Sequence, residues 1–205
     1  MEKFTKVTGV GAPLMRQNVD TDLIIRIERL VGNTSRKGLG VHCFEQIRFK
    51  PDGSENPDCI FNQPGFRDAP IILSAENFGC GSSREGAVWA LAGMGVKAVI
   101  APSFGDIFFN NCFQNGLLPV ALPLAEVNLL ADEMRASPGN ARITVDLESS
   151  TVVSPTGRTI PFKVDARRQH ALLNGLDDIG QTMQHKEAIA AWQQADQTER
   201  PWIWL

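Results

Sequence analysis

Runs of apolar residues alternate with segments of helical periodicity through the middle of the chain. The runs are short and almost free of charge, which is typical of strands buried on both faces of a sheet. Between them, apolar positions recur three and four residues apart, which favours amphipathic helices. The pattern predicts strands in residues 69–75, 96–102 and 117–123, and helices in residues 83–94, 104–115 and 124–137.

This order of strand, helix, strand, helix and strand implies parallel strands joined by right-handed crossovers. Other segments alternate apolar and polar side chains, and they predict antiparallel strands in residues 141–147 and 151–164. Residues 18–25 indicate a turn that leads into a short strand, and residues 166–175 and 185–195 favour closing helices. The chain is therefore expected to form an α/β domain with sheet layers and a helical layer.

The composition is that of an ordinary protein of one domain. A chain of 205 residues with 43% apolar residues can bury a core without disulfides or metals. A net charge of −3 argues against a general nucleic-acid binder. The N-terminal stretch lacks the apolar core of a signal peptide, and no apolar run approaches the length of a membrane span. We therefore expect a cytoplasmic location with no membrane or nucleic-acid partner.

The cysteines are Cys43, Cys59, Cys80 and Cys112, which are widely separated and form no CxxC pair. A zinc ribbon or a local iron–sulfur motif is therefore unsupported, and no metal ligand is assigned. Most such thiols in a cytosolic chain are reduced and structural. Cys80 stands apart because it lies inside a glycine-rich turn.

That glycine-rich turn carries the strongest candidate chemistry. It reads ENFGCGSSRE and joins the strand predicted in residues 69–75 to the helix that follows. Such a turn places backbone N–H groups and the positive end of a helix at the carboxyl edge of a sheet, where an anion can bind. The forked guanidinium of Arg84 suits a carboxylate. Ser82, Ser83 and Arg84 are therefore predicted to form an anion site.

Ser82 has two other possible roles. Ser82 and Glu85 have the spacing of a capping box, in which the serine caps the helix and the glutamate caps back. A serine hydrolase is a weak interpretation, because the sequence is not G-x-S-x-G and no motif links His42, His170 or His185 to Ser82. Helix capping and anion binding both stay open.

Two further charged segments precede this turn. Asp20 and Asp22 of the D-T-D sequence could begin an oxygen-ligand loop for a metal, but no EF-hand spacing follows. A turn that caps its own backbone is the favoured interpretation. Arg36 and Lys37 lie in a loop that contains several glycines, where they are either solvated or close on an acidic substrate.

Several segments of the chain match one known family in their order and spacing. They read NVDTDLII, ENFGCGSSRE, GVKAVIAPSFGDIFFNN, LLPV and ARRQHALLNGLDDIGQTMQH. Together they resemble the small subunit of 3-isopropylmalate dehydratase, which is the stand-alone form of the swivelling domain of the aconitase superfamily. The similarity is highly specific and covers nearly the whole chain.

The resemblance implies a β/β/α swivelling domain: one three-layer domain over residues 1–205, with C-terminal helices of about residues 165–197 packed on it. It implies that this chain binds no cofactor itself and works with a separate large subunit, which carries a 4Fe–4S cluster. One iron of that cluster acts as a Lewis acid on the substrate. The implied reaction converts 2-isopropylmalate, a small dicarboxylate, to 3-isopropylmalate by dehydration and rehydration in leucine biosynthesis.

The resemblance also implies a role for each residue of the site. Ser82, the first serine of G-S-S-R-E, is the base that removes the carbon-bound proton. Its alkoxide would be stabilised by the helix N-terminus, by backbone N–H groups and by Arg84, which also binds a substrate carboxylate. The implied catalytic residues are Ser82 and, at the edge of the site, Asp22. The implied substrate-binding residues are Arg84, Ser83, Arg36, Leu30 and Val31.

Three positions depart from the family pattern. Gly86 stands where the family usually has a histidine, and Arg26 stands where it usually has a proline. Arg29 precedes Leu30 where the family often has an aromatic residue. These changes keep two alternatives open. One is a related hydro-lyase for citraconate or methylmalate, dimethylmalate or homoaconitate. The other is a non-catalytic binding module with the swivelling fold, which the intact serine–arginine set disfavours.

The segment after the D-T-D turn bears on the choice of substrate. Leu30 and Val31 are apolar, whereas a relative that handles an extra carboxylate would place a cation after the leucine, and an apolar wall favours an isopropyl group. Arg26 and Arg29 favour the opposite choice if they face the substrate, and the sequence leaves their orientation open. We predict a preference for isopropylmalate.

Overall fold

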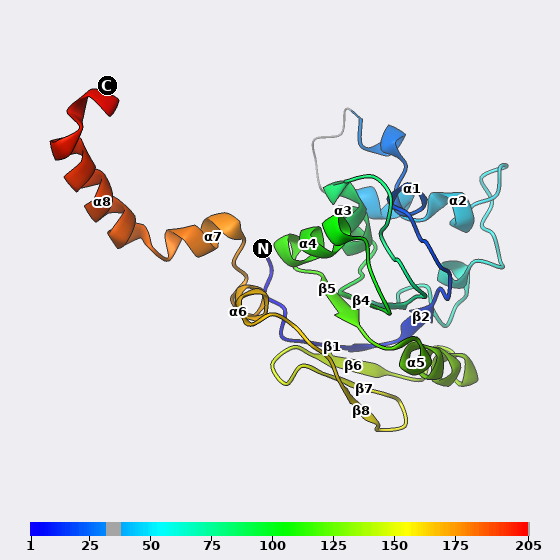
Figure 1. Ribbon diagram of the computed structural model, residues 1–205. Helices are drawn as coiled ribbons and strands as arrows, with labels where there is room; N and C mark the ends of the chain where they lie inside the picture. The colour runs from blue at the N-terminus through cyan, green and yellow to red at the C-terminus, as the bar shows by residue number, and fades with distance from the viewer. Residues whose placement is uncertain (32–37, 205) are drawn as a thin grey trace.

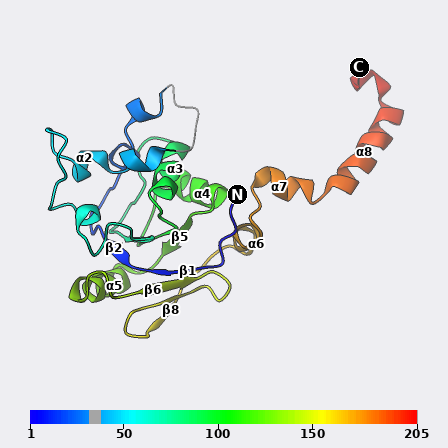
Figure 2. The same ribbon diagram turned by 180° about the vertical axis from the view of Figure 1, so that it is seen from behind.

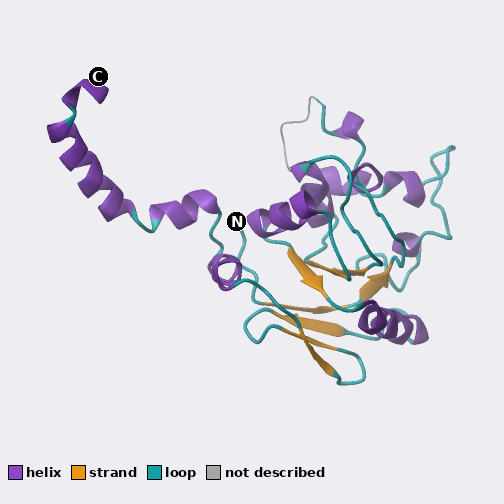
Figure 3. Ribbon diagram, viewed as in Figure 1, coloured by secondary structure: helices purple, strands orange, loops and turns teal. Residues whose placement is uncertain are grey.

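Two four-stranded sheets and a layer of helices make up the body of the protein (Figure 1 and Figure 3). The computed structural model describes residues 1–31 and 38–204. Helices α3 (Glu85–Gly93) and α4 (Asp106–Asn115) lie over one face of a parallel sheet. An antiparallel sheet and helix α5 (Leu124–Ala136) lie on the other face. The three-layer β/β/α fold predicted from the resemblance is confirmed.

Four short strands form the parallel sheet in the order β2 (Gly11–Pro13), β3 (Ile71–Leu73), β4 (Ala98–Ala101) and β5 (Leu118–Ala121). Strands β3 and β4 are buried at every position, which explains why their sequences are apolar without alternation. The three predicted core strands are confirmed. Strand β2 was not predicted, because its three residues, GAP, are too few to show an alternation of apolar and polar positions.

Four strands form the antiparallel sheet in the order β1 (Lys6–Gly9), β6 (Ile143–Asp146), β7 (Thr151–Val153) and β8 (Thr159–Pro161). In β6 the side chains of Ile143 and Val145 are buried, and those of Thr144 and Asp146 are not. One face of this sheet therefore packs on the core and the other faces water. Strand β1 continues through Val10 into β2, so the N-terminal segment joins the two sheets.

Short helices lie between β2 and β3 in the chain. They are α1 (Thr21–Ile24), η1 (Ile27–Arg29), η2 (Leu39–His42), α2 (Glu45–Arg48) and η3 (Ile60–Asn62). Helices α1 and η2 pack against α3, whereas α2 packs on α1 and η3 contacts β2. The prediction of a strand in residues 18–25 is wrong. The carboxylate of Asp20 accepts a hydrogen bond from the N–H of Leu23 at 2.7 Å, and this cap begins α1 there. The favoured interpretation of the D-T-D sequence, a turn that caps its own backbone, is confirmed.

The C-terminal part of the chain begins on the body and then leaves it. Helix α6 (Ala166–Asn174) is capped by Asp165 and buries Ala171 and Leu172. Helices α7 (Asp178–Met183) and α8 (Lys186–Glu199) and the last turn η4 (Pro201–Ile203) extend away from the sheets (Figure 1 and Figure 2). We expected all the closing helices to pack on the domain. Helix α6 does so, whereas the side chains of α8 remain outside the core.

No helix among residues 1–31 and 38–204 is both long enough and apolar enough to cross a membrane.

Candidate active site

The glycine-rich turn after β3 is held against the first turn of α1. The N–H of Thr21 donates to the carbonyl of Cys80 at 2.9 Å, and the Thr21 hydroxyl donates to the carbonyl of Ser82 at 2.9 Å. The N–H of Gly79 donates to the carbonyl of Val19 at 2.7 Å. These bonds bring the D-T-D and S-S-R sequences together, although about sixty residues of chain separate Thr21 from Ser82.

Gly79 is required by the path of this turn. Its φ angle is +75°, in the region that side chains disfavour, and a Cβ atom there would lie 2.1 Å from the ring of Phe108. The turn can therefore lie directly on α4. Substituting Gly79 would push the whole serine turn away from the helix layer.

Arg84 and Asp22 form an ion pair across the two sequences. The Arg84 side chain is 15% exposed and that of Asp22 is 50% exposed, so the arginine is the more enclosed partner. Among residues 1–31 and 38–204, Asp22 is the one carboxylate paired with this arginine. The pair fixes the guanidinium at the start of α3, where the helix adds a positive potential.

Ser82 and Ser83 are exposed beside this ion pair. Within the described part of the chain, neither hydroxyl has a hydrogen-bond partner. Helix α3 begins at Glu85, and no side chain caps its N-terminus. Both hydroxyls therefore remain accessible to a ligand that approaches the turn.

The capping box that the spacing of Ser82 and Glu85 suggested does not form. The Glu85 carboxylate accepts a hydrogen bond from the side-chain amide of Asn115 at 2.9 Å, on the neighbouring helix α4. Ser82 is held toward α1 through its carbonyl, two residues before the helical cap position at Arg84. Tertiary contacts thus override a local capping signal at both of its residues.

The described part of the predicted specificity segment, residues 26–31 after the D-T-D turn, meets α3 where Leu30 lies against Gly86. Arg26 pairs with Glu28 at 3.0 Å, and Arg29 pairs with Glu45 at 3.0 Å. Both arginines are therefore engaged by carboxylates of the chain itself. Leu30 is partly buried and Val31 is 74% exposed.

The remaining predicted site residue, Arg36, lies outside the described residues. Thr21 was not predicted as a site residue. The signal that could have identified it is its position between the two aspartates, where a buried hydroxyl can reach a neighbouring backbone.

The cysteines of the described chain are free thiols. Burial raises the pKa of the Cys43, Cys59 and Cys112 thiols, because it disfavours the thiolate. The pKa of Cys80 is raised by desolvation and by the nearby Asp20 carboxylate. Within residues 1–31 and 38–204, no group of three or more His, Cys, Asp and Glu side chains could hold a metal ion.

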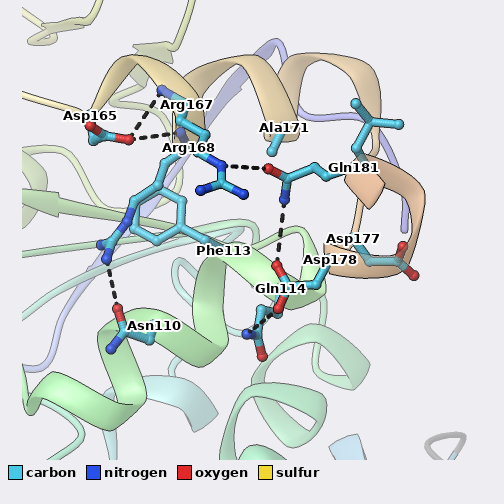
Figure 4. A pocket seen from close by; sticks show the side chains of 11 residues that line it. Asn110, Phe113, Gln114, Asp165, Arg167, Arg168, Ala171, Asp177, Asp178 and Gln181 are labelled. Atoms are coloured by element: carbon cyan, nitrogen blue, oxygen red, sulfur yellow. Dashed lines mark hydrogen bonds between the residues drawn. The ribbon is translucent and has the colours of Figure 1, made fainter. Parts of the chain in front are cut away.

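A polar pocket of about 620 Å³ lies elsewhere, between α4, α6 and α7 (Figure 4). Its side chains bond to one another: Arg168 donates to Asn110 at 2.8 Å, and Arg167 donates to Gln181 at 3.2 Å. The Arg168 guanidinium also lies over the ring of Phe113, 5.0 Å from its centre. The contacts of Arg168 join α6 to α4, and the contact of Arg167 joins α7 to α6. None of the residues predicted for the active site lines this pocket.

Comparisons with known proteins place the chain in a family. A family model described as the aconitase C-terminal domain matches residues 1–125. The small subunit of 3-isopropylmalate dehydratase from Dinoroseobacter shibae is 52% identical over 99% of this chain and 100% of its own length. The chain belongs to the family of 3-isopropylmalate dehydratase small subunits. The counterpart from Gluconacetobacter diazotrophicus is also 52% identical, over 98% of this chain and 97% of its own length.

Other matches extend this small-subunit assignment to the rest of the chain. A model described as LeuD_N matches residues 128–166. Another, described as the C-terminal domain of the 3-isopropylmalate dehydratase small subunit, matches residues 178–203. The crystal structure of 3-isopropylmalate dehydratase from Methanocaldococcus jannaschii superposes with a TM-score of 0.65. It is 25% identical, and the alignment covers 91% of this chain and 98% of that chain. The family predicted from the sequence is confirmed.

Proposed function

We propose that this chain is the small subunit of a hydro-lyase that converts 2-isopropylmalate to 3-isopropylmalate, in leucine biosynthesis. The observation that supports the proposal most directly is the ion pair between Arg84 and Asp22, beside two serine hydroxyls that have no partner among the described residues. This is the serine and arginine set that the family resemblance assigned to the reaction. The set lies on the surface of the chain, where another protein can close over it.

The partner is a large subunit that carries a 4Fe–4S cluster. Among the described residues of this chain no ligand set for a metal is assembled, which fits a cluster whose ligands come from the large subunit. Such a cluster, when bound, supplies a Lewis acid for the substrate hydroxyl. The groups that bind the substrate and move its proton are side chains of this chain.

Arg84 binds one carboxylate of the substrate. Its guanidinium presents several N–H donors in a plane, so it can keep Asp22 on one edge and take a substrate carboxylate on another. Asp22 acts by holding the guanidinium in place. Arg36 is proposed to contribute a second cation to the dicarboxylate.

Ser82 moves the proton. Its alkoxide removes a proton from the carbon next to the one that carries the hydroxyl, and the hydroxyl leaves to give an alkene. Rehydration with the opposite orientation returns the proton to the other carbon. The serine hydroxyl is a poor base, so the reaction needs its alkoxide. The positive end of α3 and the Arg84 guanidinium stabilise that alkoxide and make it easier to form. Ser83 donates a hydrogen bond to the bound substrate.

The segment at Leu30 and Val31 faces the substrate alkyl group. Arg26 and Arg29 are held by Glu28 and Glu45, which supports an isopropyl group over a further carboxylate. A related dicarboxylate hydro-lyase remains the alternative that the test distinguishes. The cytoplasmic location expected from the sequence stays a prediction.

Reconstitution tests the proposed function. The purified chain should show no turnover of 2-isopropylmalate after metal removal, and it should gain turnover when a cluster-loaded large subunit from the same organism is added. Substantial activity of the chain alone would contradict the proposal. Absence of activity at every ratio of the two subunits would contradict it as well, provided that the large subunit binds.

A further inference from the structure

The C-terminal arm, residues 178–204, is a helical extension with little of its surface covered. It comprises α7, α8 and η4 and extends from the body in both views (Figure 1 and Figure 2). Every residue of α8 except Asp196 is exposed. Helix α8 has 14 residues, and an isolated helix of about that length is only marginally stable in water. The arm therefore gains stability from any surface that covers it.

Large apolar side chains are exposed at the end of the arm. Ile189 and Trp192 are three residues apart and Asp196 follows four residues later, so all three share one face of α8. The ring of Trp204 folds back to lie 6.5 Å from that of Trp192. Trp192 is 59% exposed and Trp202 is 66% exposed. Large apolar side chains exposed close together in this way are typical of an interaction surface.

The end of the arm has a defined shape. The Asp196 carboxylate accepts hydrogen bonds from the indole N–H of Trp204 at 2.8 Å and from the guanidinium of Arg200. Those two partners, Trp204 first, lower the pKa of Asp196. Asp196 therefore holds η4 against α8 and keeps Trp204 beside Trp192.

The base of the arm is also fixed. The side-chain amide of Gln114 donates to the Asp178 carboxylate at 3.0 Å, and Arg167 donates to Gln181 (Figure 4). The arm therefore leaves the body from a definite place beside α4 and α6. Ile179 and Met183 on α7 add two exposed apolar side chains near this base.

We propose that this arm docks on the large subunit, with Trp192 and Trp202 as its anchors. The proposal rests on the proposed function, which supplies the partner. The matched model for residues 1–125 is, by its description, the C-terminal domain of a longer protein, and here that domain is a separate chain. The arm matches a different model, one described for small subunits. A domain separated from its partner needs contacts that restore a high effective concentration.

The area of the arm fits this role. The exposed tryptophan side chains of the arm present roughly 250–400 Å², taking about 150–250 Å² for each aromatic side chain that is fully exposed. A standard interface uses about 800 Å² on each partner. A pair of arms from two copies would fall short of that area through these rings. A large subunit must also cover Ser82 and Arg84, so the arm and the site face would both contribute to its interface.

The test compares two double variants of the full chain. Trp192→Ala/Trp202→Ala removes the anchors and leaves the Asp196 contacts intact. Gln194→Ala/Thr198→Ala changes the opposite face of α8 and serves as the matched control. Each variant is titrated anaerobically with the cluster-loaded large subunit from the same organism. Far-UV circular dichroism and thermal melting of each chain alone establish that the body is folded.

We expect the tryptophan variant to raise the dissociation constant at least tenfold and the control to change it less than twofold. The kcat at saturating large subunit should be unchanged in both, because neither variant touches the active site. An unchanged dissociation constant for the folded tryptophan variant overturns the proposal. A wild-type homodimer that the tryptophan variant dissolves also overturns it, in favour of a second copy as the occupant. Either result can occur while the wild-type pair is active, so the arm can fail without the proposed function failing.

Discussion

Leu30 fills the space that a side chain at position 86 would need. A Cβ atom on Gly86 would lie 2.6 Å from Cδ2 of Leu30 and 2.8 Å from its Cδ1. Gly86 belongs to the first turn of α3, two residues after Arg84. The glycine is therefore the place where the specificity segment rests on the helix that carries the arginine. A histidine at this position, as in the family pattern, requires a different placement of residue 30.

Gly86→Ala should disturb the specificity segment without unfolding the protein. Alanine favours the helix by about 0.5–1 kcal/mol, and displacement of Leu30 opposes that gain. We therefore expect a small change in the free energy of unfolding and a rise of several-fold in KM for 2-isopropylmalate. Urea unfolding and steady-state kinetics of the reconstituted enzyme measure the two effects.

A double-mutant cycle isolates this contact. Leu30→Val shortens the side chain that meets position 86, so the cost of Gly86→Ala should be smaller in that background. The expected coupling is at least about 0.5 kcal/mol, which is typical of residues in contact. Strictly additive effects on stability and on KM would show that the two residues act independently.

Ser82→Ala should abolish turnover with almost no effect on stability. Loss of a general base costs about 10²–10⁴-fold in kcat or more. Because Ser82 does not cap α3, the free energy of unfolding should change by less than about 0.5 kcal/mol. The reconstituted variant is assayed for kcat and the chain alone is melted.

Ser83→Ala is the matched control for this change. It removes a neighbouring hydroxyl that is equally exposed, and we expect a much smaller loss of kcat. If turnover survives in Ser82→Ala and falls in Ser83→Ala, the proton transfer must be reassigned to the second serine.

Asp22→Asn should weaken substrate binding by releasing Arg84. The substitution keeps the shape of the side chain and removes the charge that pairs with the guanidinium. We expect kcat/KM to fall about tenfold, which corresponds to about 1.4 kcal/mol. Stability should change by only about 0.2–1 kcal/mol, because Asp22 is half exposed.

Asp132→Asn provides the comparison for Asp22→Asn. Asp132 pairs with Arg135 at 3.1 Å on the exposed side of α5, far along the chain from the serine turn. Its loss should leave kcat/KM unchanged. Equal kinetic effects of the two variants would mean that the Asp22 pair is an ordinary surface contact.

The sequence predicted the parallel half of the fold well because each core strand is buried at nearly all its positions. Strands β3 and β4 are apolar throughout, and no other element type fits such short runs between turns. The strand predicted in residues 18–25 failed because one hydrogen bond from Leu23 to Asp20 decides between a helical turn and a strand. Periodicity over so few residues could not decide it.

The sequence predicted which residues the candidate site would contain but not their contacts. Ser82, Arg84 and Asp22 were predicted as site residues, and the structure brings them together. The capping box was wrong because Asn115, about thirty residues away, binds Glu85. The partner of Arg29, Glu45, could not be predicted either. Whether a cation faces a pocket or a neighbouring carboxylate depends on how η1 and α2 approach each other, and no local pattern encodes that approach.

Val31→Arg should change which substrate the enzyme prefers. Val31 follows Leu30 and is 74% exposed in this chain, so a substrate or the large subunit can cover it. A buried methylene contributes about 0.8 kcal/mol, and an unpaired charge against an alkyl group costs more than that. We expect kcat/KM of the reconstituted enzyme for 2-isopropylmalate to fall at least tenfold, relative to a homoaconitate-type substrate with an extra carboxylate. Leu129→Arg, at an exposed apolar position on α5, should leave this ratio unchanged.

The ratio of the two kcat/KM values in the wild type, for 2-isopropylmalate and for the substrate with the extra carboxylate, shows whether Arg26 or Arg29 takes part in substrate choice. Arg29 is held by Glu45 and Arg26 by Glu28, so the wild type should prefer the isopropyl substrate. Glu45→Gln releases Arg29 and should move the ratio toward the substrate with the extra carboxylate. A wild type that already prefers that substrate would contradict the assignment. The effect of Glu45→Gln would then show whether Arg29 is the residue that leaves its partner to bind it.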